Sequence, residues 1–181
     1  MAKNFIYFAG SLPMLLFGEK PPVSVEVFDD DAARLTDERT AAMLKKAVLY
    51  DPQAEGLPSS VQKFYEWEGF LRNSWLDFRK KSRSDAGDFK RENNAFYSDV
   101  APALAQAANC TDLMEAEKII DRLRWNILEN LSTGHYFDLD FLALYRIKLQ
   151  ILTKYTVRTV EKGNQVLEDI LRALNDESKT N

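Results

Sequence analysis

The apolar residues between positions 113 and 155 recur at helical spacing and predict two consecutive helices. In the first, steps of three and four residues line one face with Leu113, Ala116, Ile120, Leu123, Ile127 and Leu131. In the second, one stripe holds Leu142, Tyr145, Leu149 and Leu152, and an adjoining stripe holds Phe141, Leu144, Ile151 and Tyr155. A helix with two adjoining apolar stripes is contacted from more than one side, so we expect the second helix to be central.

Capping residues mark the ends of these two helices. Thr111 precedes the first and can accept a backbone N–H, while Asp112 places negative charge at the positive end of the helix. Gly134 follows the last periodic residue, where glycine favours a left-handed C-terminal cap. Asp138 can then cap the second helix. The pattern predicts a helical hairpin, which is a packing device.

The rest of the chain also favours helices. A helix over residues 60–82 is predicted by its apolar side, which is formed by Val61, Phe64, Tyr65, Leu71, Trp75 and Phe78. A shorter helix is expected after Ser24, and another from the N-cap Thr36 through Leu49.

Two further segments complete this interpretation. Ser98 and Asp99 start a small alanine-rich helix, and residues 4–8 are β-prone and predict a short strand or an extended arm. We therefore expect an all-α helical bundle with long antiparallel helices and at most a short N-terminal extended segment. We expect residues 1–181 to form a single helical domain, with a sub-boundary in the polar linker 84–95 as the alternative.

Composition excludes several functional classes. The 181 residues are 45% hydrophobic, which suits one compact domain with its own core. A net charge of −4 lacks the basic footprint of a general nucleic-acid-binding protein. The single cysteine, Cys110, cannot form an internal disulfide, and the apolar start is interrupted by Gly10 and Pro13. We expect a cytoplasmic protein.

Two groups of charged residues on the helix over residues 60–82 are candidates for a special role. Glu68 and Arg72 lie four residues apart on its apolar side, which leaves two interpretations. Either the pair sits at the margin of the stripe and reaches solvent, or it fixes helix register or shapes an interface. At the end of the helix lies a basic cluster of Arg79, Lys80, Lys81 and Arg83, continued by Lys90 and Arg91. It is either a solvated helix end or an interface, and such an interface would bind an acidic partner surface or anionic lipid head groups.

Catalytic patterns are weak in this sequence. His135, Asp138 and Asp140 are the residue types of a metal or acid–base site, but Asp138 is already explained as a cap, and residues two apart do not share a helix face. Cys110 has only His135 as a conceivable base, on another segment. No glycine-rich phosphate loop is present. We expect no catalytic residues, no cofactor and no bound metal.

Three stretches carry a resemblance to a known family: FIYFAGSLPML near the start, FYEWEGFLRNSWLDFRKKS, and RLRWNILENLSTGHYFDLDFLALYRIKLQILTKY. A weaker match is EKGNQVLEDIL. Together they cover well over half of the chain. It resembles an uncharacterised bacterial family encoded beside V-type ATPase genes, which is distantly similar to the C/d-type central-stalk subunit of V/A-type ATPases. Within the matching stretches we single out as structural motif Tyr65, Glu68, Arg72, Trp75, Arg124, Trp125, Phe137 and Asp138.

This resemblance implies a function without catalysis. The central-stalk subunit of that type is helical and funnel-like, sits on the membrane rotor ring and passes torque from the central shaft without binding nucleotide. It is longer than this chain and built from three related helical units, so this chain has room for only part of it. The resemblance implies a non-catalytic accessory or coupling subunit of a V-type ATPase or ATP synthase complex involved in ion or proton transport. Its partners would be the rotor ring or central shaft, at the cytoplasmic side of the inner membrane. The alternative is a stand-alone helical regulator or small enzyme.

Overall fold

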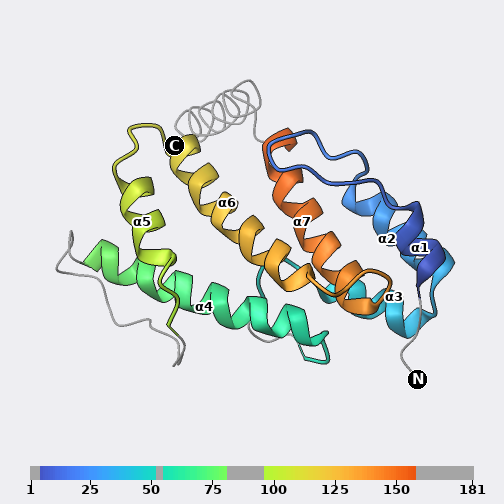
Figure 1. Cartoon of the computed structure of the whole chain (residues 1–181). Coiled ribbons are helices and arrows are strands. Elements are labelled where there is room, and N and C mark those ends of the chain that lie inside the picture. Colours follow the sequence, from blue (N-terminus) through green and yellow to red (C-terminus); the bar gives the residue numbers. More distant parts are fainter. Residues whose placement is uncertain (1–4, 52–54, 81–95, 158–181) are drawn as a thin grey trace, which may run out of the picture.

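The computed structural model describes residues 5–51, 55–80 and 96–157, and within these ranges it contains helices and no strands (Figure 1). The predicted all-α fold is confirmed. The helices in chain order are α1 (Ile6–Ser11), α2 (Val25–Leu35), α3 (Glu38–Lys46), α4 (Ser59–Lys80), α5 (Val100–Ala108), α6 (Leu113–Ser132) and α7 (Leu139–Val157).

Helices α6 and α7 form the predicted hairpin and lie side by side in Figure 1. Gly134 ends the first helix with a φ of 87°, a left-handed conformation that glycine adopts without a Cβ penalty. Asp138 caps the second, because its Oδ1 accepts a hydrogen bond of 2.9 Å from the backbone N–H of Phe141. At the start of α6, Asp112 rather than Thr111 is the N-cap and accepts from the N–H of Met114.

Helix α7 is the central element, as its two apolar stripes predict. It packs against α6 and α4, and on its other side against α2 and α3. Every side chain from Leu142 to Leu149 is buried, including those of Arg146 and Lys148. The remaining helices are arranged around this rod, with α4 crossing beneath α6 and α7 in Figure 1.

The expected N-terminal strand or extended arm is wrong, because residues 6–11 form helix α1. Phe8 is buried against Phe28 of α2, with ring centroids 5.2 Å apart, and Phe28 in turn stacks on Tyr145 of α7. A helix presents Phe8 to this aromatic cluster, so tertiary packing overrides the β-propensity of the segment. Residue 4, where the expected strand began, lies outside the described residues.

Other boundaries shift by one or a few residues. Asp37, not Thr36, caps α3 and accepts from the N–H of Thr40. The hydroxyl of Thr36 instead bonds to the carbonyl of Ala32 and closes α2. Helix α3 ends at Lys46, three residues before the predicted end, because Ala47 has a ψ of 78° and leaves the helical conformation. The predicted end of the fourth helix at Ser82 lies outside the described residues, as does the alternative sub-boundary at 84–95.

The apolar stripe predicted for α6 is only partly a core stripe. Leu123 is buried, and Ile120, Ile127 and Leu131 pack partly against the core, but Leu113 is 82% exposed. The helix instead buries Asp121, Trp125 and Leu128. Within the described ranges, none of the helices combines the length and apolar character needed to cross a membrane.

Candidate functional site

A buried network of charged side chains joins α4, α6 and α7. Glu68 of α4 is fully buried, and its two carboxylate oxygens accept hydrogen bonds of 2.8 Å each from Nε and Nη2 of Arg124 on α6. Nε of Arg72 donates to the same carboxylate at 2.9 Å. The interpretation that the Glu68–Arg72 pair sits at the margin of the stripe is therefore wrong for Glu68, although Arg72 is 43% exposed.

The network continues from Arg124 to α7. Nη1 of Arg124 donates to the buried carboxylate of Asp121 at 2.8 Å. Lys154 of α7 reaches both oxygens of Asp121 at 3.1 Å, and the hydroxyl of Tyr155 donates to it at 2.9 Å. Lys154 also lies 3.8 Å from Glu117. Three acidic and three basic side chains thus balance one another at the junction of three helices.

Burial and neighbouring charges set the protonation of this network. Burial lowers the pKa of Arg124, but the carboxylates of Glu68 and Asp121 raise it by more than burial lowers it. The net pKa is therefore raised, and the guanidinium stays charged. Burial and the negative charge of Asp121 raise the pKa of Tyr155, which keeps its hydroxyl protonated as a donor. The donors and acceptors here bond to one another, so the network fixes the relative positions of α4, α6 and α7.

The buried charge network and a second group of charged hydrogen bonds hold opposite sides of α7, and we call them the two clamps. The guanidinium of Arg146 donates two hydrogen bonds, of 2.7 and 2.8 Å, to the carboxylate of Asp29 on α2. It also donates to the carbonyl of Ala47, the C-cap residue that follows α3, at 2.9 Å. Gln150 donates to the same carbonyl and accepts from the N–H of Leu49. Bidentate pairing of this kind fixes both distance and orientation.

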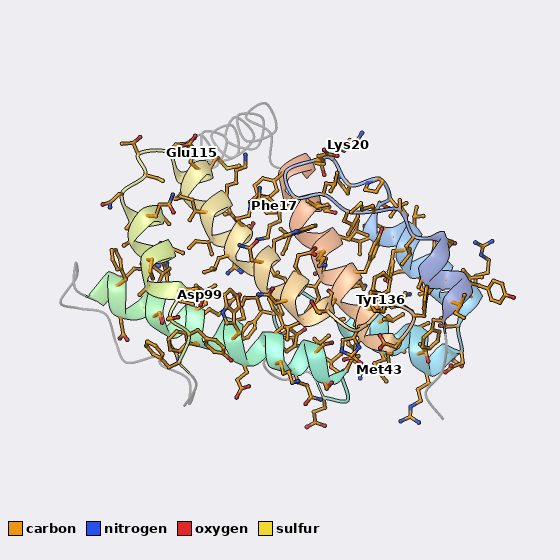
Figure 2. The ribbon with its side chains drawn as sticks, viewed as in Figure 1. Phe17, Lys20, Met43, Asp99, Glu115 and Tyr136 are labelled. Carbon is orange, nitrogen blue, oxygen red and sulfur yellow. The ribbon has the colours of Figure 1, made fainter. Side chains whose placement is uncertain are left out.

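The aromatic residues of the predicted structural motif occupy different places. Trp125 is buried between α6, α7 and the segment before α2, where its ring lies 5.6 Å from that of Phe17, which Figure 2 shows lying over α6 and α7. The hydroxyl of Tyr65 donates to the carbonyl of Val48, and burial raises the pKa of Tyr65 to about 12. Trp75 is half-buried and stacks on Phe78.

An apolar cleft lies between α4, α5 and α6 and has a volume of about 810 Å³. Its walls include Trp75 and Leu76 from α4, Leu104 from α5, and Leu113 and Ile120 from α6. Arg72 and Arg124 line it where it meets the charge network, and Glu117 and Cys110 also border it. The exposed first part of the predicted α6 stripe therefore faces this cleft.

A second apolar region is exposed at the other end of the molecule, which we call the amino-terminal apolar surface. It consists of Ile6, Tyr7, Tyr136 and Phe137, all exposed, and Tyr7 is 91% exposed. The backbone N–H of Phe5 donates to the carbonyl of Phe137 at 2.8 Å, which joins α1 to the α6–α7 turn. Figure 2 shows Tyr136 in this turn. Large exposed apolar residues on two segments that are joined in this way are typical of docking surfaces.

The basic cluster at the end of α4 is described only in part. Arg79 is exposed, and Lys80 is the last residue of α4. Lys81 and Arg83, with Lys90 and Arg91, lie outside the described residues.

The structure brings His135, Asp138 and Asp140 together, although the two-residue spacing suggested that the carboxylates point apart. Candidate ligand atoms of all three lie within 4.8 Å of one another. The spacing argument fails because Asp138 is an N-cap and does not follow helical geometry. Asp138 Oδ2 lies 2.6 Å from Nδ1 of His135, and Asp140 Oδ1 accepts from the N–H and hydroxyl of Ser60 at 2.9 and 2.6 Å. These contacts give the three residues a structural role at the starts of α7 and α4.

Sequence reasoning missed the partners of these clamps. It placed Glu68 with Arg72 but did not connect it to Arg124, and it did not single out Asp29, Asp121 or Arg146. The available signal was a charged residue inside an apolar run, as with Arg146 and Lys148 between Leu142 and Leu152. Such a residue is buried only with a partner, although the partner itself cannot be found from the pattern.

Comparison with known proteins identifies a family. Residues 78–178 match the family described as "Protein of unknown function (DUF2764)". The match covers more than half of the chain, which therefore belongs to this family. It includes α5, α6 and α7 and thus Asp121, Arg124 and Lys154 of the charge network. No curated protein and no solved structure matches the chain.

Proposed function

We propose that this member of the family is a non-catalytic accessory or coupling subunit of a V-type ATPase or ATP synthase complex. In this proposal it contacts the rotor ring or central shaft and reaches the membrane only through the complex, at its cytoplasmic side. The observation that carries the proposal is the amino-terminal apolar surface. Its residues come from two of the stretches that resemble the ATPase-associated family, FIYFAGSLPML and the stretch that contains Tyr136 and Phe137.

The internal clamps also support this proposal. A subunit that transmits torque has to resist sliding and rotation of its helices. Helix α7 is tied to α6 through Asp121 and to α2 through Asp29, by charge-assisted hydrogen bonds of 2.7–3.1 Å. Because charge-assisted bonds of this geometry are strong and directional, the helices hold their register under load.

A pull-down from native membranes tests the proposal. The tagged chain is expected to co-elute with rotor-ring or shaft subunits of the ATPase. Replacing Tyr7 and Phe137 together by serine removes much of the exposed apolar area, so the double variant should lose most of this retention. Met14→Ser is the matched control, because Met14 is similarly exposed but lies outside the surface.

A second variant tests the basic cluster. Replacing Arg79, Lys80, Lys81 and Arg83 by glutamate should leave folding intact and weaken retention if the cluster meets an acidic surface. Equal retention of this variant and the wild type would remove the cluster from the interface. A chain that stays monomeric and never co-elutes with any ATPase subunit would refute the proposed function as a whole.

A further inference from the structure

The apolar cleft between α4, α5 and α6 has a wall that the described residues leave uncovered. Leu113 begins the predicted apolar stripe of α6 yet is 82% exposed, and Ile120, further along the stripe, also lines the cleft. Trp75 and Leu76 face the same space from α4. An open apolar space of about 810 Å³ on a small protein indicates a place where another apolar group binds.

The sequence continues past α7 with a segment of matching character. Within residues 158–181, an amphipathic pattern places apolar residues at positions 166, 167, 170, 171 and 174, which lie on one side of a helix. The polar residues Glu168, Asp169 and Arg172 lie on the other side. We expect such a segment to bury its apolar side against an apolar surface.

The end of α7 is next to the cleft. Lys154, in its last turn, lies 3.8 Å from Glu117, which borders the cleft. Residues 158–165 separate Val157 from the apolar pattern, and eight residues span at most about 28 Å when extended. The pattern is therefore within reach of the cleft without any movement of α7.

We propose that residues 166–174 of the same chain dock in the cleft between α4, α5 and α6 and cover Leu113 and Ile120. A tethered segment has an effective concentration on the order of millimolar, so it competes well against a second copy or a separate partner. The other segment outside the described residues near the end of α4, at positions 81–95, fits the cleft less well. It is polar, with Phe89 as its one large apolar side chain.

Cys110 provides a direct test, because it borders the cleft and is the single cysteine of the chain. Single cysteines are introduced along the segment, and disulfide formation is followed under mild oxidation at low protein concentration. Leu167→Cys, Leu171→Cys and Leu174→Cys lie on the apolar side, and at least one of them should form an intramolecular disulfide with Cys110. Arg172→Cys is the matched control on the polar side and should stay reduced.

The reactivity of the Cys110 thiol gives a second readout that needs no new cysteine. In the full chain the docked segment shields the thiol, so its modification by a small aromatic disulfide reagent should be about tenfold slower than in a chain ending at Val157. The full-length double variant Leu171→Ser with Leu174→Ser should show the same faster modification of Cys110. This variant keeps the test valid if the truncated chain does not fold. Arg172→Ser should react like the wild type, and Cys110→Ser should not react at all.

Three outcomes would overturn the proposal. Equal thiol reactivity in the full chain and in the folded variants would mean that the segment does not cover the cleft. Equal disulfide formation by the cysteines on the apolar side and by Arg172→Cys would mean that the segment meets Cys110 by random collision and does not dock with a defined orientation. Disulfide-linked dimers in place of the intramolecular product would assign the cleft to a second copy of the chain. None of these results bears on ATPase retention, so the proposed function is judged separately.

Discussion

Replacing Arg124 by methionine should be one of the most damaging single changes in this fold. Arg124 donates three hydrogen bonds of 2.8 Å to two fully buried carboxylates, those of Glu68 and Asp121. Removing one partner of a buried ion pair typically costs about 3–5 kcal/mol, because the remaining charge is left desolvated. Glu68 keeps Arg72, and Asp121 keeps Lys154, so we expect the lower end of this range.

The expected loss is therefore about 3 kcal/mol of the free energy of unfolding. For a chain of this length it corresponds to a decrease in Tm of roughly 6–12 °C. Urea unfolding followed by circular dichroism measures the free energy, and tryptophan fluorescence provides an independent probe of the same transition. A total stability of about 5–15 kcal/mol would leave the variant folded at 25 °C.

Arg72→Met is the matched control. Arg72 bonds to the same Glu68 carboxylate, but through one hydrogen bond and from a side chain that is 43% exposed. Its replacement should cost at most about 1 kcal/mol. If the two variants differed by less than about 0.5 kcal/mol, burial would not set the strength of the network, and the reasoning would be refuted.

Two further changes test other parts of the fold. Trp125→Ala removes a ring that is buried between α6 and α7 and should lower the free energy of unfolding by roughly 3–5 kcal/mol, whereas an unchanged melting curve would mean that the ring is exposed in solution. Burial raises the pKa of Asp140, but hydrogen bonds from Ser60 and the electrostatic influence of His135 together lower it by more, so its net pKa lies below the ordinary 3.8. The contribution of this carboxylate to stability is therefore complete above about pH 5 and is lost as the pH falls below about 4. Asp140→Asn should be less stable than the wild type at pH 7 and approach it at pH 3 in urea titrations, and a constant difference across this range would contradict the assignment.

The sequence predicts the helices of this protein well and their partners poorly. Helical periodicity and caps such as Gly134 and Asp138 act within a few residues, so the α6–α7 hairpin could be predicted from local pattern alone. The helical state of α1 depends on the contact of Phe8 with Phe28, which no local signal contains. The junction of Glu68 with Arg124 joins residues 56 positions apart, and the cleft arises only when α5 and α6 pack over α4. Long-range pairing of this kind is set by the three-dimensional arrangement.

The two clamps on α7 have a consequence for hydrogen exchange. Arg146 ties the rod to Asp29 on one side, and Lys154 ties it to Asp121 on the other. Local unfolding of α7 alone would break the charged hydrogen bonds to both neighbouring helices at once. Exchange of its amides through local opening is therefore energetically unfavourable. We expect the amides from Leu142 to Leu152 to exchange last, at a rate set by the unfolding of the entire molecule.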